Sequence, residues 1–166
     1  MVERPRSTKR LGELLMEQGL LTPAQLERAL EHQRLTKEFL GVILLRMKLV
    51  PAKTLLATLS EQFKMPCESL TPERVDWTVV DQFSPSALSS EHCFPIRADA
   101  ESVTVAMVNP LDAWALSAIE QVVKFRTVKP VLVLPEELAH VQQAYRQRSM
   151  QRIATQLNSD GRHQAH

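Results

Sequence analysis

The sequence predicts an α+β fold: a four-helix subdomain of two tandem helical hairpins, followed by a small α/β subdomain with a three-stranded sheet. Three observations predict it. Residues 10–33 and 39–62 repeat one helical pattern, the composition changes after residue 64, and the rest alternates short apolar runs with helical stripes. We expect the subdomains to span 8–64 and 71–147. The polar residues 148–166 are expected to form a frayed helix followed by a disordered tail.

The two copies of the repeat are similar enough to indicate duplication. Without gaps, seven of the 24 aligned pairs are identical, against about two expected by chance. The identical pairs are Leu11/Leu40, Gly12/Gly41, Leu15/Leu44, Leu20/Leu49, Leu26/Leu55, Leu30/Leu59 and Gln33/Gln62.

Each copy has the pattern of two helices joined by a turn. In the first copy, Gly19 suits the left-handed position after a helix. Thr22-Pro23-Ala24-Gln25 then provides an N-cap hydroxyl, a proline at the first helical position and the glutamine of a capping box. In the second copy Pro51 begins the second helix. Lys48 stands where the first copy has Gly19, so we expect that helix to end differently.

Two glycines are unusual because they sit early in helices. At Gly12 and Gly41, glycine costs up to about 1 kcal/mol relative to alanine. Either a tight helix crossing or the close approach of a ligand would explain them. The chain has four glycines in all, and it contains no GxxxxGK[ST] or GxGxxG motif. Nucleotide hydrolysis by this chain alone is therefore not expected.

The second half reads as strand, strand, helix, strand, helix. A boundary is expected near residues 65–71, where prolines begin to interrupt the chain. Expected helices span 73–82, 86–92, 112–125 and 136–146, and expected strands span 93–98, 102–108 and 128–134. Pro130 favours an edge position for the last strand. Trp77 and Trp114 are expected in the core or between the subdomains.

Charge and cysteine usage exclude several function classes. Residues 1–64 carry 11 Lys/Arg against seven Asp/Glu, and residues 65–140 carry five against 11. This is not the dense basic stripe that nucleic acids require. The two cysteines are far apart and the five histidines dispersed, so we expect no metal, no cofactor and no catalytic activity. No segment resembles a membrane span or signal peptide, which predicts a cytoplasmic protein without membrane insertion.

The first copy resembles the nucleotide-binding motif of the MshEN domain, the N-terminal domain of type II secretion and type IV pilus assembly ATPases of the GspE and PilB kind. The resemblance covers about residues 8–147 and stops before the ATPase motor. We therefore expect either a piece of such an ATPase or a protein that acts in trans on secretion or pilus components, including an ATPase. The motif positions are Arg10, Leu11, Gly12, Leu15, Met16, Gly19, Leu20, Leu21, Leu26, Leu30 and Gln33.

The resemblance implies that the tandem copies bind one molecule of cyclic di-GMP. An arginine can make bidentate hydrogen bonds to a guanine edge or a phosphate. Leucines can pack against the purine faces, and glutamine can hydrogen-bond the ligand. Asn109 stands where the family usually has an aspartate near the nucleotide, although it also suits a turn or N-cap before Pro110. The implied ligand-binding residues are Arg10, Leu11, Gly12, Leu26, Leu30, Gln33, Phe39, Leu40, Gly41, Leu55, Leu59, Gln62 and Asn109.

The second copy departs from the motif at two positions. Phe39 replaces the arginine and Lys48 replaces the second glycine. Phe39 can stack on a purine or belong to the core, but it cannot make the bidentate contact. The expected function is a non-enzymatic, cyclic di-GMP-binding regulatory or adaptor domain, located in the cytoplasm and brought to the inner membrane by partners. The alternative is a nucleotide-blind interaction domain that docks onto secretion or pilus components.

Overall fold

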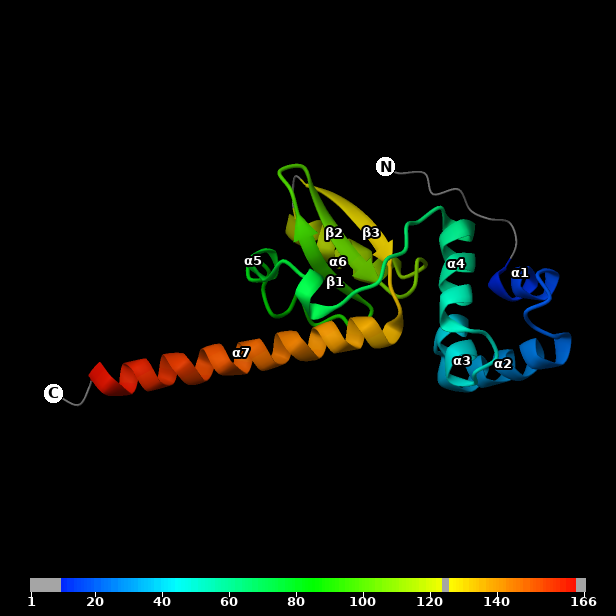
Figure 1. The fold of residues 1–166 in the computed structure, drawn as a ribbon, viewed down its shortest axis with the longest axis horizontal. Helices are drawn as coiled ribbons and strands as arrows, with labels where there is room; N and C mark the ends of the chain where they lie inside the picture. Colours follow the sequence, from blue (N-terminus) through cyan, green and yellow to red (C-terminus); the bar gives the residue numbers. More distant parts are fainter. Residues whose placement is uncertain (1–9, 124–125, 164–166) are drawn as a thin grey trace.

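In the computed structural model, which describes residues 10–123 and 126–163, four helices stand beside a three-stranded sheet (Figure 1). The helical unit (residues 10–64) contains α1 (Leu11–Glu17), α2 (Pro23–Thr36), α3 (Leu40–Arg46) and α4 (Ala52–Phe63). The α/β unit (residues 65–163) contains η1 (Pro72–Arg74), α5 (Trp77–Val80), β1 (Cys93–Ala98), β2 (Ser102–Met107), α6 (Ala113–Val123), β3 (Thr127–Leu132) and α7 (Pro135–His163). The predicted fold class is confirmed.

The sheet has the order β1-β2-β3, with β1 antiparallel and β3 parallel to β2. Pro130 lies in β3 at the edge, where its missing N–H breaks no ladder bond, as predicted. The segment after α4 is also tied to this edge. Glu68 N donates to Leu132 O (3.0 Å), and Leu132 N donates to Pro66 O (2.8 Å). The boundary between the two units is therefore hydrogen-bonded to the sheet.

The two faces of the sheet are covered by different helices. Val103, Val105 and Met107 share one buried cluster with Ile119 of α6, and this cluster continues into the helical unit through Leu15 and Leu44. On the opposite face, Ala106 of β2 shares a second cluster with Leu138 and Val141 of α7. The core on the α6 side therefore joins the two units. In Figure 1, α7 runs along the sheet and continues well beyond it.

The hairpins have the caps that the sequence predicts, with one correction. Thr22 Oγ1 accepts from Gln25 N, and Gln25 Oε1 accepts from Thr22 N. Gly19 has φ +70°, but Lys48 also has a left-handed φ, +54°. The expectation that α3 ends differently is therefore wrong: the hydrogen bonds that close α1 after Met16 recur after Leu45 with the same spacing.

Four further expectations differ from the structure. The segment 73–82 forms only the short η1 and α5. The segment 86–92 forms turns, in which Ser84 Oγ accepts from Ala87 N and Ser89 Oγ donates to the Ser86 carbonyl. The tail from residue 148 continues as α7 to His163, since nothing between Pro135 and Gly161 interrupts a helix. Trp114 is exposed, because Ala115, Leu116 and Ile119 occupy the buried side of α6. The expected bounds at residues 8, 124–125 and 164–166 lie outside the described residues.

Candidate functional site

The two repeats place equivalent residues at the starts of α1 and α3. Arg10 is the N-cap of α1, and its backbone N–H donates to the Glu13 carboxylate (3.1 Å). Phe39 is the N-cap of α3 and has no side-chain capping bond. Both caps have extended backbone, so each residue's side chain leaves the helix start in the same local frame.

The two unusual glycines lie at equivalent helix crossings that differ in tightness. A Cβ on Gly12 would lie 2.6 Å from Leu26 Cδ1, so the tight-crossing explanation holds there. A Cβ on Gly41 would lie 3.5 Å from Leu55 Cδ2, which is ordinary van der Waals contact. A methyl group at position 12 would therefore force the Leu26 side chain to shift, whereas position 41 has room for one.

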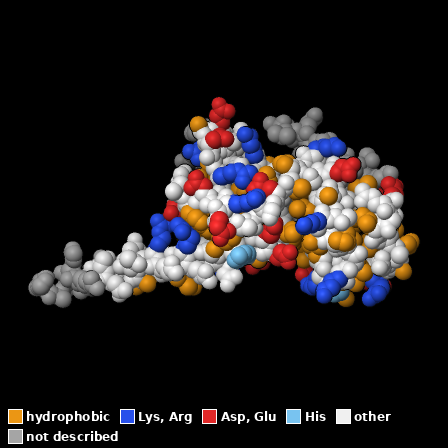
Figure 2. All heavy atoms as spheres, in the orientation of Figure 1, with side chains coloured by type: hydrophobic (Ala, Val, Ile, Leu, Met, Phe, Trp, Pro, Cys, Tyr) orange, Lys and Arg blue, Asp and Glu red, His pale blue; other side chains and the backbone are white. Residues whose placement is uncertain are grey.

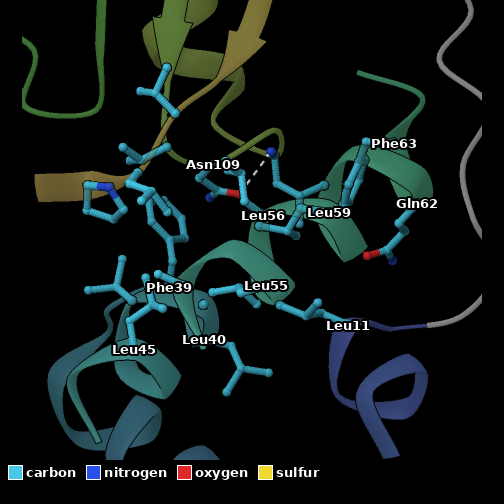
Figure 3. A pocket seen from close by; sticks show the side chains of 18 of the residues that line it. Leu11, Phe39, Leu40, Leu45, Leu55, Leu56, Leu59, Gln62, Phe63 and Asn109 are labelled. Atoms are coloured by element: carbon cyan, nitrogen blue, oxygen red, sulfur yellow. Dashed lines mark hydrogen bonds between the residues drawn. The ribbon is translucent and has the colours of Figure 1, made fainter. Parts of the chain in front are cut away.

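A cavity of about 550 Å³ opens between the helical unit and the α/β unit, and Figure 3 shows its walls. This volume is in the range of small-molecule sites. The helical unit contributes Arg10, Leu11, Gln33, Phe39, Leu40, Gly41, Val42, Leu45, Ala52, Leu55, Leu56, Leu59, Gln62 and Phe63. The α/β unit contributes Val108, Asn109, Leu111, Val133, Leu134 and Pro135, from the loop after β2 and from the end of β3 to the start of α7.

Most of the sequence-predicted residues line this cavity. The exceptions are Gly12, Leu26 and Leu30: Gly12 and Leu26 pack against each other, and Leu30 is half-buried outside the cavity. Sequence reasoning missed the wall from Val133 to Pro135, because this segment reads only as a strand end and a helix start. Its one available signal was Pro135 directly after the apolar run.

The polar groups of the cavity are few and individually oriented. Gln33 Nε2 donates to the Glu38 carbonyl (3.0 Å) and so holds the loop between α2 and α3. Asn109 Oδ1 accepts from Leu111 N (3.0 Å), the turn that the sequence suggested as one reading of Asn109. Asn109 Nδ2 is buried without a hydrogen-bond partner. Because this nitrogen can only donate, it requires an acceptor, and a bound ligand can supply one.

Charge is unevenly distributed around the cavity. Among the described residues that line it, Arg10 is the one cation, and it is exposed. In the second repeat, Arg46 forms a two-pronged ion pair with Glu38, and this hydrogen bonding lowers the pKa of the Glu38 carboxyl. The Phe39 ring meets the His92 ring edge-on, with centroids 5.4 Å apart, so Phe39 joins the two units and also lines the cavity.

Figure 2 shows hydrophobic side chains gathered over the helical unit, while Lys, Arg, Asp and Glu side chains mix over the sheet. Within 10–123 and 126–163, no group of three His, Cys, Asp or Glu residues is arranged to hold a metal ion. None of the helices in these ranges is long and apolar enough to cross a bilayer. The residues that line the cavity make it an apolar site with a few hydrogen-bonding groups and one cation, Arg10, at its edge.

The sequence is similar to one protein family and to several longer proteins. The family model described as MshEN domain matches residues 63–152, which contain most of the α/β unit and not the tandem repeat. Type IV pilus assembly ATPase PilB of Thermus thermophilus is 32% identical over 114 residues, which are 68% of this chain and 13% of that protein. The same-named protein of Myxococcus xanthus is 27% identical over 112 residues, which are 67% of this chain and 20% of that protein.

Bacteriophage adsorption protein B of Escherichia coli (strain K12) is 28% identical over 129 residues, which are 78% of this chain and 17% of that protein. The chain spans a fifth or less of the length of these relatives.

Two solved structures are similar over most of the chain. MshE, in a structure described as MshE with cdg, has a TM-score of 0.68 and 27% sequence identity, and the match covers 82% of this chain and 99% of that one. The N-terminal domain of XpsE has a TM-score of 0.64 and 21% identity, with 86% and 97% of the two chains covered. The XpsE likeness extends the shared fold to both units.

Proposed function

Since the chain belongs to the MshEN domain family, whose members here include the N-terminal parts of pilus assembly ATPases, we propose that it is a non-enzymatic regulatory or adaptor domain that binds cyclic di-GMP. The ligand would occupy the cavity between the two units. The domain would act in the cytoplasm on a type II secretion or type IV pilus assembly system, through protein partners that hold it at the inner membrane. The likeness to MshE, solved with cdg, the abbreviation of cyclic di-GMP, supports this ligand.

The observation that carries the proposal is that repeat-related residues line one cavity in pairs. Arg10 and Phe39 occupy equivalent positions, as do Leu11 and Leu40, and Gln33 and Gln62. Cyclic di-GMP consists of two identical halves related by a two-fold axis. A duplicated motif offers each half a similar set of groups, whereas a ligand without this symmetry would use the two sets differently.

The chemistry of the walls suits the parts of this ligand. Leu40, Leu55 and Leu59 provide apolar contact for purine faces. Arg10 can fork onto a phosphate or onto guanine O6 and N7. The free donor of Asn109 can bond to an oxygen of the ligand, which would satisfy the nitrogen that the protein leaves unpaired.

The two halves of the ligand are bound unequally in this proposal. Phe39 supplies an aromatic face where Arg10 supplies charge, and Arg46 nearby is already paired with Glu38. A bidentate charged contact is commonly worth about 1–3 kcal/mol. We therefore expect affinity about one to two decades below that of a domain with arginine in both repeats.

Calorimetric titration of the chain with cyclic di-GMP tests the proposal. Arg10→Ala should weaken binding at least tenfold without changing the far-UV circular dichroism spectrum, since the Arg10 side chain is exposed. Arg28→Ala, an exposed arginine of α2 outside the cavity, is the matched control and should bind as the parent does. Absence of binding up to about 100 μM, a weak affinity on the usual scale, would contradict the proposal.

The second candidate is a nucleotide-blind interaction domain of the same family. The uncharged Phe39 favours it, because its ring contact with His92 gives this residue a packing role between the two units. In that case Arg10→Ala and the parent would capture the same secretion or pilus components, and cyclic di-GMP would change neither result. Dependence of capture on cyclic di-GMP, lost in Arg10→Ala, would favour the nucleotide-binding function.

A further inference from the structure

The two ends of the cavity carry different recognition groups, although equivalent positions of the repeat contribute to both. Figure 3 shows Leu11, which follows Arg10, and Phe39 on opposite sides of the cavity. Phe39 lies close to Asn109, because its ring contacts the His92 ring and the His92 carbonyl accepts from the backbone N–H of the residue before Asn109 (3.2 Å). We call Arg10 and Leu11 the Arg10 end, and Phe39 and Asn109 the Phe39 end.

The Asn109 amide is buried and has a defined orientation. Its side chain belongs to a residue that is 9% exposed, and Oδ1 accepts from Leu111 N (3.0 Å), the bond drawn in Figure 3. An amide nitrogen cannot accept from an N–H, so this bond fixes which atom is the oxygen. Nδ2 is therefore the donor that has no partner, and Oδ1 keeps a second lone pair.

This pair of groups distinguishes adenine from guanine. Adenine carries the acceptor N7 beside the donor N6–H₂, so a side-chain amide can donate to N7 and accept from N6. Guanine carries two acceptors, O6 and N7, at the same edge, and the two donors of an arginine match them. The Asn109 amide therefore fits adenine, as Arg10 fits guanine. Phe39 adds an aromatic face, and stacking on such a face does not select between bases.

We propose that the Arg10 end binds guanine and the Phe39 end binds adenine, so that the ligand that fits this chain best is the mixed cyclic dinucleotide cyclic GMP–AMP. This inference rests on the proposed function, because it keeps the cavity and the class of ligand and changes one base. Cyclic di-GMP also binds, but its second guanine satisfies only the donor of the Asn109 amide. Cyclic di-AMP is disfavoured, because the donors of Arg10 would face the N6–H₂ donor of adenine.

Calorimetric titration of the chain with the three cyclic dinucleotides tests the inference. Cyclic GMP–AMP should bind at least as tightly as cyclic di-GMP and at least tenfold more tightly than cyclic di-AMP. Weaker binding of cyclic GMP–AMP than of cyclic di-GMP would overturn the inference and leave the proposed function standing. A smaller difference from cyclic di-AMP would also overturn it, because Arg10 would then not select guanine. Binding of none of the three would contradict the proposed function as well.

Two variants at the Phe39 end test the residues themselves. Asn109→Asp keeps the size of the side chain and the acceptor for the backbone N–H, but it replaces the donor by an acceptor. It should lower the affinity for cyclic GMP–AMP relative to that for cyclic di-GMP at least tenfold. Phe39→Arg gives the second copy the arginine of the first and should shift this ratio in the same direction.

Asn158→Asp is the matched control, because it makes the same change at an exposed asparagine of α7 outside the cavity. Its ratio of affinities should equal that of the parent. Far-UV circular dichroism shows which variants keep the fold. A ratio unchanged from the parent in a folded Asn109→Asp or Phe39→Arg chain would overturn the assignment of adenine to this end.

Discussion

The left-handed residue that ends the first helix of each repeat is glycine in one copy and lysine in the other. Gly19 and Lys48 have the same sign of φ, and the backbone bonds to Leu15 and Leu44 that follow them are 2.9 and 3.0 Å long. The turn therefore keeps its geometry without glycine. For a side chain with a Cβ, this backbone conformation costs about 1–2 kcal/mol, which the surrounding hydrogen bonds and packing offset.

Relief of this strain gives a prediction at Lys48. Lys48→Gly should raise the free energy of unfolding by about 1 kcal/mol, because glycine adopts the left-handed conformation without a Cβ penalty. Gly19→Ala should lower it by a similar amount. Urea denaturation followed by circular dichroism measures both changes. Met47→Gly is the control at the neighbouring right-handed residue, where glycine should be destabilising. A Lys48→Gly chain less stable than the parent would contradict this explanation.

Replacement by alanine should affect stability differently at the two motif glycines. Gly12→Ala should destabilise the fold by about 1–2 kcal/mol, since Leu26 must move away from the new methyl group. Gly41→Ala should leave stability unchanged or slightly higher, because its methyl group fits beside Leu55. If the cavity binds cyclic di-GMP, Gly41→Ala should nevertheless weaken binding. Thermal unfolding and calorimetry of the two variants check this, and equal loss of stability in both would contradict it.

At the scale of elements, the sequence predicted correctly those features that depend on interactions between residues close together in the chain. The capping box at Thr22, the left-handed Gly19 and the edge proline Pro130 each act within a few residues, so the sequence alone places them. The expected helix over 86–92 is wrong: Ser84 Oγ accepts from Ala87 N and Ser89 Oγ donates to the Ser86 carbonyl within turns, and the spacing of apolar residues does not reveal such bonds. The expected helix over 136–146 was too short: α7 continues to His163, and the contacts of Arg148 with Trp77 and of Arg152 with Asp81, which are distant in sequence, hold part of this extension against the α/β unit.

The segment that connects the units predicts a pH dependence. Arg97 makes two hydrogen bonds of 2.7 Å to the Glu68 carboxylate, which lower the pKa of this group below its ordinary 4.5. A lowered carboxyl pKa contributes stability that is complete above pH 4.5 and is lost as pH falls through the lower folded value. Since the pair is partly exposed, Arg97→Ala should cost less than about 1 kcal/mol at pH 7.

Urea denaturation of Arg97→Ala and the parent at a series of pH values checks this expectation. The difference in the free energy of unfolding should be constant at neutral pH and shrink below pH 4.5. Arg34→Ala, an exposed arginine of α2, should show no such pH-dependent difference. A difference for Arg97→Ala that persists at pH 2 would mean that the arginine contributes by packing rather than by its charge.

At the scale of the whole molecule, the repeat predicted one wall of the cavity and tertiary folding supplied the other. Arg10, Gln33, Phe39 and Gln62 could be identified because duplication marks them. The wall from Val133 to Pro135 has no such mark, since it faces the cavity only after β3 pairs with β2 and the loop after α4 joins the sheet edge. For a site between two units, the motif therefore identifies only the residues of the unit that contains it.

This shared cavity gives the last prediction, measured by hydrogen exchange. Ligand at 100 times its dissociation constant stabilises the bound state by about 2.7 kcal/mol. Because both units line the cavity, cyclic di-GMP should slow amide exchange at residues 39–45 of the helical unit and also at 108–111 and 132–136 of the α/β unit. The same experiment on Arg10→Ala, at equal ligand concentration, should show reduced protection in both units. Protection confined to the helical unit would mean that the ligand does not contact both units. In that case the ligand would not supply the hydrogen-bond acceptor that Asn109 Nδ2 lacks.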